Sequence, residues 1–357
     1  MPLKHNTGKS FQGSIVLGKG FVLTTEQAEA LIAKDPRNKE VLFPYLNGDD
    51  LNNNPEQKAS RWVINFFDWP EDRARTYPDC FEIVERLVRP ERQRWLKDKN
   101  GYEIVGTYAL RKPLPQRWWI YGEKRPALYQ TISKLDHVMA INRHAKYLLI
   151  SIGQKNIVYS EATIVIASDS YSDFSILSSA VHDVWAWKNS STMGASTLRY
   201  SASNAFETFP FPNDPLNRLE KLGYELNVFR RDLMRNAKIG LTETYNRFND
   251  KDLNQSSELY EAILKLRNIH CEIDKAVTEV FNWNDLDLKH DFYEVEFLPE
   301  SDRVRFTVPP DTRKEILSRL FNLNQKRHAD TIDNVEAVAE MKKVKISLEN
   351  INLFSNQ

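Results

Sequence analysis

The sequence has little cysteine, no long apolar run and no net charge. Its two cysteines, Cys80 and Cys271, stand far apart without a CxxC pair or a histidine at ligand spacing, which argues against a disulfide framework and a zinc site. The longest apolar runs, 147–152 and 162–167, are too short to span a bilayer, and residues 1–8 lack the apolar stretch of a signal peptide. We therefore expect a cytoplasmic protein without a membrane partner.

The motifs of several enzyme classes are also missing. There is no P-loop, no HExxH and no G-x-S-x-G, and the seven histidines are scattered. The pair Gly18 and Gly20 lacks the third glycine of a cofactor loop, and the Pro309-Pro310 pair is a helix-entry signal rather than the Asn/Asp-Pro-Pro-aromatic tetrapeptide of a DNA methyltransferase. His182 lies near a buried helical stripe, which favours a structural role. We expect no catalytic residue, no metal site and no cofactor in this chain.

Charge is unevenly distributed along the chain. The 49 basic residues balance the 49 acidic ones, but residues 86–155 carry fifteen Lys/Arg against five acids, so this segment is +10 and the remainder is −10. Eight aromatic residues lie within the segment: Trp95, Tyr102, Tyr108, Trp118, Trp119, Tyr121, Tyr129 and Tyr147. Such a pattern fits a face that binds a polyanion such as DNA. It also fits a solvated surface that pairs with acidic residues of the same chain.

Hydrophobic periodicity predicts an α+β fold with two domains. Residues 1–213 are expected to form a mixed α/β domain, and residues 214–357 a mainly α-helical C-terminal domain. Thr24 and Gln27 have the spacing of a helix capping box. In the first domain we predict helices over 27–34, 79–96, 126–134 and 172–187, and strands over 61–67, 117–121, 138–141, 147–152 and 162–167. In the second we predict helices over 216–237, 258–281, 311–326 and 334–345.

An ordered series of sequence blocks resembles one known family. The blocks include 9–14 (KSFQGS), 41–51 (VLFPYLNGDDL), 118–128 with its Arg125-Pro126, Arg199-Tyr200-Ser201 with 206–212 (FETFPFP), and 283–288. Together they resemble the C-terminal target-recognition and helical region of MmeI-like, S-adenosylmethionine-dependent, adenine-specific DNA methyltransferases and restriction–modification enzymes. The resemblance extends from Gly8 to about His328.

The resemblance implies a module that recognises double-stranded DNA. In that family the methyltransferase core precedes the target-recognition domain, and this chain begins where that core would end. Methylation of adenine N6 and the binding of S-adenosylmethionine are therefore expected of a separate catalytic domain or subunit in a restriction–modification or phage-defence system. We expect this chain to contribute sequence specificity.

The candidate DNA-contacting residues come from two arguments. Alignment on Arg199-Tyr200-Ser201 implies that Ala195 and Thr197 read bases, and Thr can hydrogen-bond a base edge whereas Ala offers only an apolar contact. Without the resemblance, residues 190–196 would be interpreted as a solvent-exposed loop. Residue type and position add candidates for phosphate or base contacts, although Arg125 could instead cap a helix and Trp119 could belong to the core. The full set is Arg117, Trp119, Arg125, Arg143, His144, Lys146, Ala195, Thr197, Arg199 and Tyr200.

Two other functions are compatible with parts of the pattern. In the first, the amphipathic helices after residue 216 bind a protein partner, and the chain is an adaptor in a defence complex. Those helices serve equally well as a domain core. The second, an autonomous hydrolase or nuclease, requires a catalytic constellation that the sequence does not show.

Overall fold

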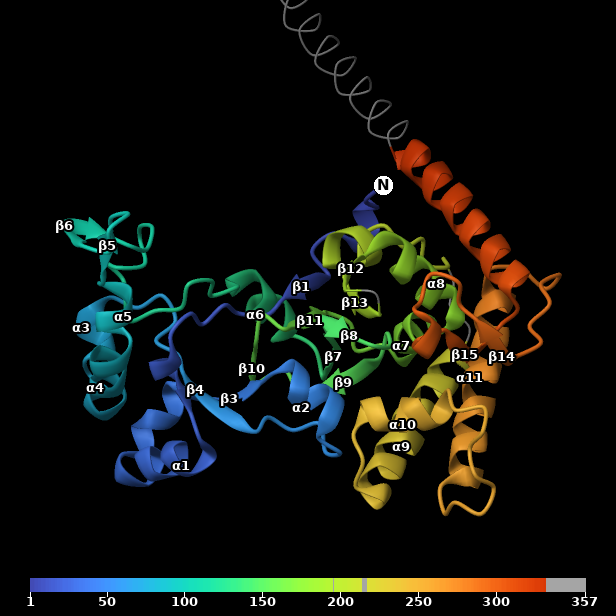
Figure 1. Ribbon diagram of the computed structural model, residues 1–357, viewed down its shortest axis with the longest axis horizontal. Coiled ribbons are helices and arrows are strands. Elements are labelled where there is room, and N and C mark those ends of the chain that lie inside the picture. Colours follow the sequence, from blue (N-terminus) through green and yellow to red (C-terminus); the bar gives the residue numbers. More distant parts are fainter. Residues whose placement is uncertain (195, 214–216, 332–357) are drawn as a thin grey trace, which may run out of the picture.

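The computed structural model describes residues 1–194, 196–213 and 217–331. Up to residue 213 short strands and short helices alternate, and from residue 217 the chain is mainly helical, so the fold is α+β as predicted (Figure 1). The predicted helix over 334–345 lies outside the described residues. Within the described ranges, no helix combines the length and apolarity needed to cross a membrane.

Two four-stranded sheets lie in the first part of the chain. The first has the order β1-β11-β7-β9 with antiparallel neighbours, and the second has the order β10-β3-β4-β2, in which β10 runs parallel to β3. Their strands are β1 (Ser10–Gln12), β2 (Val22–Leu23), β3 (Leu42–Leu46), β4 (Arg61–Ile64), β7 (Val138–Asn142), β9 (Ile150–Gly153), β10 (Val158–Tyr159) and β11 (Thr163–Ile166).

Three smaller sheets lie beside these two. One has the order β12-β13-β8, and each of the others is a two-stranded hairpin. Their strands are β5 (Trp95–Lys97), β6 (Glu103–Tyr108), β8 (His144–Ala145), β12 (Ser191–Met193), β13 (Thr197–Arg199), β14 (Asp291–Glu294) and β15 (Val304–Thr307).

The helices before residue 213 are short, whereas α9 and α11 each have 21 residues. The helices are α1 (Thr25–Lys34), α2 (Gly48–Asn53), α3 (Glu71–Ala74), α4 (Pro78–Leu87), α5 (Arg89–Arg92), α6 (Pro126–Ile132), α7 (Tyr171–Leu177), α8 (Ala180–Asn189), α9 (Asn217–Ala237), α10 (Leu241–Phe248), α11 (Tyr260–Val280) and a helix over 310–331. Shorter helical turns are η1 (Lys4–Asn6), η2 (Lys19–Phe21), η3 (Pro36–Glu40), η4 (Ala202–Phe206) and η5 (Glu300–Asp302).

The start of α1 confirms the predicted capping box. The Thr24 hydroxyl accepts a hydrogen bond from the Gln27 backbone N–H at 3.3 Å, and the Gln27 side chain accepts one from the Thr24 N–H at 3.0 Å. Two backbone donors at the helix start are therefore satisfied locally.

The largest apolar core joins both parts of the chain. Side chains of β7, β11, α7 and α8 pack with those of α9, α11 and the helix over 310–331 in one cluster, in which Phe174, Leu226 and Ile273 are fully buried. A second core lies around β4 and α4, and a third between α6 and β7. The helical part therefore supports the sheet that contains β7 and β11.

Two predicted helices are each divided in the structure. The segment 79–96 forms α4 and α5 and then enters β5, because Pro90 lacks the backbone N–H needed to continue one helical ladder. The segment 172–187 forms α7 and α8, because the Ser179 hydroxyl accepts a hydrogen bond from the His182 N–H and starts a new helix.

The predicted strand over 117–121 is wrong. Four consecutive side chains, from Trp118 to Tyr121, are buried in the second core, and a strand would alternate between buried and exposed positions. The carbonyls of Trp118 and Ile120 accept hydrogen bonds from the guanidinium of Arg92 instead of from a neighbouring strand. The segment is a series of turns.

Candidate nucleic-acid interface

The centre of the candidate interface is the pairing of β8 with β13. In this antiparallel register His144 lies opposite Arg199 and Ala145 lies opposite Leu198. Next to it, the Tyr200 N–H donates to the Arg143 carbonyl at 2.9 Å, and the Arg143 N–H donates to the Ala162 carbonyl at 2.8 Å. The backbone thus fixes two distant segments, around residues 143 and 199, side by side.

Three arginines and a histidine are brought close together here. The pKa of Arg143 is lowered by burial and by the positive charges of Arg199 and Arg125. The pKa of His144 is lowered by burial and then by Arg143 and Arg199. These mutual effects require the charges to be near one another, and we call Arg125, Arg143, His144 and Arg199 the basic cluster.

The basic cluster is poorly neutralised. No ion pair between described residues includes Arg143, His144 or Arg199, and Arg125 is 3.9 Å from Glu123. Arg143 and Arg199 line a hollow of about 400 Å³ together with Gln12 and one acidic residue, Glu207, which forms no ion pair with either arginine. Like charges held close repel one another, so an anion such as a phosphate would stabilise this arrangement.

The hairpin β12–β13 extends from the basic cluster. Ser191 pairs with Arg199, and Met193 pairs with Thr197 at the end of the ladder. Met193 is 58% exposed and Thr197 is half-buried, so the end of this hairpin is accessible. Ala195, the other expected base-reading residue, lies outside the described residues.

Two further predicted cations are engaged elsewhere. The Arg117 guanidinium forms an ion pair with Asp68 at 2.6 Å, and Lys124 shares the same carboxylate. The Lys146 ammonium forms an ion pair with Asp302 at 2.8 Å. These two residues are therefore less available to phosphate than those of the basic cluster.

Trp119 and Tyr200 were predicted to contact DNA, but both side chains are buried, so we remove them from the candidate site. Trp119 is 7% exposed and its indole N–H donates to the Trp69 carbonyl at 3.0 Å. Tyr200 is 1% exposed and its hydroxyl lies 3.0 Å from His182 Nε2. Neither ring has a free face for a base. The same contact confirms the structural role of His182, whose pKa burial lowers to about 3.

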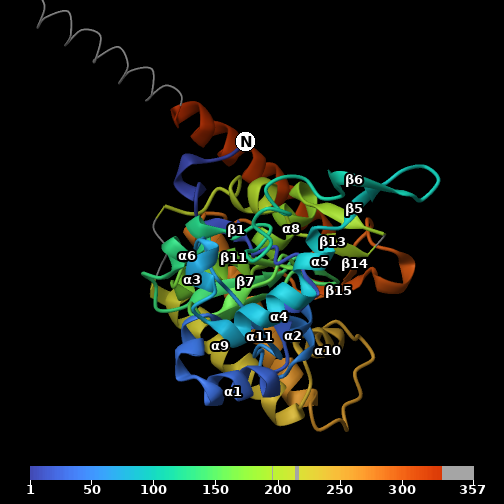
Figure 2. The same cartoon turned by 90° about the vertical axis from the view of Figure 1, so that its left-hand side faces the viewer.

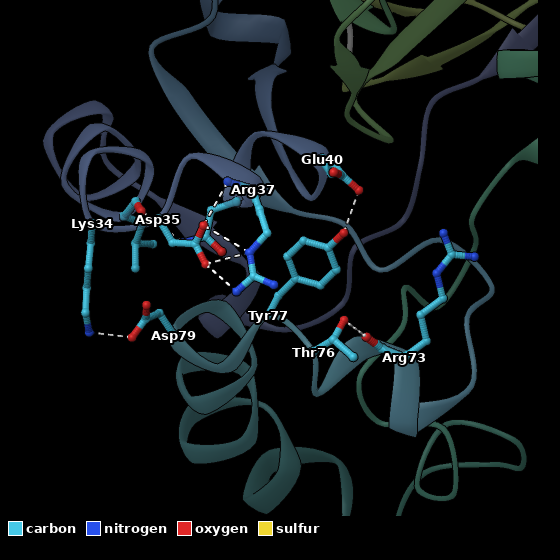
Figure 3. A network of polar contacts seen from close by, with 10 residues as sticks. Lys34, Asp35, Arg37, Glu40, Arg73, Thr76, Tyr77 and Asp79 are labelled. Atoms are coloured by element: carbon cyan, nitrogen blue, oxygen red, sulfur yellow. Dashed lines mark hydrogen bonds and ion pairs between the residues drawn. The ribbon is translucent and has the colours of Figure 1, made fainter.

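A contrasting polar surface lies where α1 and η3 meet α4 (Figure 3). Lys34 forms an ion pair with Asp79 at 2.5 Å, and Arg37 forms one with Asp35 at 2.7 Å. The Tyr77 hydroxyl donates to Glu40 at 2.6 Å, a bond that raises the pKa of Tyr77. The positive charges of Lys34 and Arg37 are each paired with a carboxylate. This surface is therefore a structural junction rather than a phosphate site.

The β5–β6 hairpin was not predicted from the sequence. The sequence does contain a signal for it, because the pair Asn100-Gly101 is typical of hairpin turns. In the structure Gly101 has φ +86°. The described residues contain no group of three or more His, Cys, Asp or Glu side chains that could hold a metal ion.

Comparisons with known proteins identify what this chain resembles. A family model described as "MmeI, target recognition domain" matches residues 6–213. A solved structure of the type IIL restriction–modification enzyme MmeI in complex with DNA superposes with a TM-score of 0.57 at 18% sequence identity, a level that shows a shared fold. The superposition covers 92% of this chain and 36% of that chain, so this chain spans about a third of its length. No curated protein matches the sequence.

Proposed function

The chain belongs to the MmeI target recognition domain family, and on this premise we propose that it binds duplex DNA and supplies sequence specificity to a DNA adenine methyltransferase. The observation that carries the proposal is the poorly neutralised basic cluster at the base of an accessible hairpin. Phosphate contacts position a protein on DNA, and side chains in a groove read the sequence. The site contains groups of both kinds.

The basic cluster is assigned to the DNA backbone. Arg143 and Arg199 present guanidinium groups, which match the geometry of phosphate oxygens, beside the half-buried imidazole of His144. Each phosphate neutralised releases condensed counterions, so the affinity should fall with salt at a logarithmic slope of about −0.9 per contact.

The β12–β13 hairpin is assigned to the bases. A two-stranded ribbon fits the major groove of B-form DNA, where each base pair presents its own pattern of donors and acceptors. Thr197 can donate to or accept from a base edge, and it lies two residues from Arg199, so phosphate anchoring and base reading share one strand. Ala195 is proposed as an apolar neighbour of that contact.

The catalytic partner is proposed from the family. In that family S-adenosylmethionine is bound by the methyltransferase core, and we propose the same here. Gly20, one of the two glycines considered for a cofactor loop, is packed against α4. A Cβ at Gly20 would lie 2.5 Å from the Leu87 Cβ, so this glycine permits helix packing rather than ligand binding. We place the assembly in the cytoplasm.

Selection from a random-sequence duplex pool tests the proposal. The purified chain is titrated into the labelled pool at several salt concentrations, and the retained DNA is sequenced. We expect one enriched motif and a steep salt dependence. In the double variant R143Q/R199Q, the magnitude of the slope should fall by about 0.9 for each arginine.

A charge-matched control makes the result specific. The variant K221Q/K251Q also removes two positive charges, from exposed positions in the helical part, and should behave like the parent chain. Equal binding by both double variants would refute the assigned site. No DNA retention at any salt concentration, with a co-purifying protein instead, would refute DNA recognition and support the adaptor function.

A further inference from the structure

The β5–β6 hairpin projects from the body of the molecule, and we call residues 95–108 the arm. Figure 1 shows it at one end of the long axis, and Figure 2 shows its loop extending beyond the other elements. In β6, the five residues from Glu103 to Thr107 are exposed. Within the described residues, β5 and β6 pair only with each other.

The arm has a defined structure of its own. Asp98 accepts hydrogen bonds from the N–H groups of Asn100 and Tyr102 at 2.8 and 2.9 Å, and the Asp98 N–H donates to the Tyr102 carbonyl at 2.8 Å. At the other end, the rings of Trp95 and Tyr108 stack with centroids 4.7 Å apart. These contacts hold the turn and the base of a hairpin that has little support from the core.

The arm exposes apolar side chains to solvent. Val105 is 78% exposed, Tyr102 is 71% exposed, and Leu96 and Ile104 are each about two-fifths exposed. Isolated two-stranded hairpins are marginally stable in water, and four exposed apolar side chains on one indicate a binding partner.

Charge indicates which partner the arm fits. Arg94, Lys97, Lys99, Arg111 and Lys112 lie on or beside it, with Asp98 and Glu103 as the acidic residues in this stretch. None of those five cations forms an ion pair with another described residue. The Asp98 carboxylate is already bound to backbone N–H groups of the turn. Within the arm two lysines balance two acids, and Lys97 lies opposite Glu103 in the β5–β6 register. The positive excess comes from Arg94, Arg111 and Lys112 beside it. The arm and these flanking residues together form a basic and apolar surface, which suits a nucleic-acid groove lined by phosphates.

The arm also lies on the same side of the molecule as the proposed recognition hairpin. In Figure 1 the β5–β6 and β12–β13 hairpins are separated along the long axis, and in Figure 2 the strands β5, β6 and β13 lie on the right-hand side. Both hairpins thus lie toward one side of the long axis, an arrangement that contact with a single duplex requires.

We infer that the arm is a second DNA-contacting element, which enters a groove of the same duplex outside the bases read by β12–β13. This inference rests on the proposed function. Lys97 and Lys99 contact phosphates, while Tyr102 and Val105 contact sugars and the apolar edges of bases. The arm lengthens the DNA footprint and adds affinity that depends little on sequence.

The test compares K97Q/K99Q with the charge-matched K221Q/K251Q control. Binding to a mixed-sequence duplex is measured over a range of salt concentrations, and hydroxyl-radical footprints are taken on a duplex that carries the selected motif. For K97Q/K99Q we expect the magnitude of the salt slope to fall by about 0.9 per lysine. We also expect loss of protection at one end of the footprint and retention of the same motif.

A second variant, Y102S/V105S, keeps every charge and should weaken binding without changing the salt slope. Equal thermal unfolding of all variants verifies that the body remains folded. If the parent binds its motif but both arm variants match the control in affinity and footprint, the arm inference fails and the proposed function stands. If the parent retains no DNA, the proposed function fails and the arm inference fails with it.

Discussion

His144 and Arg199 lie directly opposite each other across the β8–β13 pair, although 54 positions separate them in the sequence. The register places an imidazole beside a guanidinium, with Arg143 next to both. Each positive charge disfavours protonation of the imidazole. The pKa of this histidine therefore reports on the charges of Arg143 and Arg199.

The first prediction concerns the pKa of His144. Burial and then the charges of Arg143 and Arg199 lower it, so R199Q should raise it by removing one of the repulsive charges. An NMR titration of the histidine ring signals measures this shift, with R61Q as a control at a distant exposed position. Binding of DNA should also raise the pKa, because phosphates stabilise the imidazolium. An unchanged value in R199Q would contradict the geometry of the cluster.

The second prediction separates base reading from phosphate anchoring. T197A should reduce discrimination at one base pair by about 1–3 kcal/mol and leave the salt slope unchanged, because a base-edge hydrogen bond is lost without a change in charge. R143Q should instead weaken binding to all sequences. Competition between the selected motif and its single-base variants measures both effects. A uniform loss in T197A would remove Thr197 from the base-reading set.

The third prediction concerns the buried guanidinium of Arg92. It donates to the carbonyls of Val16, Leu17, Trp118 and Ile120, and burial lowers its pKa to about 10. R92M leaves these carbonyls without their donor, and we expect a loss of about 3–5 kcal/mol in the free energy of unfolding. Denaturant unfolding measures it. R86M, at an exposed position of α4, is the control and should change stability by less than about 0.5 kcal/mol.

The fourth prediction is a pH dependence of stability that originates at Asp183. Burial raises the pKa of this carboxyl on α8 from 3.8 to about 6, against the opposing charges of Arg313 and Arg305. At a pH between these two pKa values, the Asp183 carboxyl is deprotonated in the unfolded chain and protonated in the folded chain. Folding therefore becomes less favourable as the pH rises through this window, by about 3 kcal/mol in total.

The variant D183N isolates this contribution. It should be more stable than the parent above pH 6, and the difference should vanish below about pH 4, where both forms of the parent are protonated. Urea unfolding at a series of pH values provides the measurement. D311N, which changes a carboxylate that is 99% exposed, should show no such difference. Equal stability of D183N and the parent above pH 6 would contradict the prediction.

Local patterns predicted the parts of the fold that depend on neighbouring residues. The capping box at Thr24 and the two long helices α9 and α11 follow from spacing that is visible in the sequence. The placement of Arg143 beside Arg199 depends on strand pairing between distant segments, and no local pattern contains that information. Each residue could be predicted separately from the sequence, but their proximity is seen only in the fold.

Residue type alone misassigned the aromatic candidates. Trp119 and Tyr200 have polar atoms that suit a DNA surface and equally suit a core in which each atom finds a partner. Arg92 shows the same limit for a charged residue. It contributes to the net charge of the basic segment, but it is fully buried and donates to carbonyls from two distant stretches of chain. Burial of this kind depends on tertiary contacts.

The position of Arg92 also bears on how the arm could change. The arm begins at Trp95, three residues after this guanidinium, and the four carbonyls that hold Arg92 all come from outside the arm. The contacts of Arg92 are thus independent of the arm's own side chains, while the Trp95–Tyr108 stack closes the base of the hairpin. We therefore predict that the segment between Trp95 and Tyr108 can be changed in length and sequence while the contacts of Arg92 beneath it remain intact.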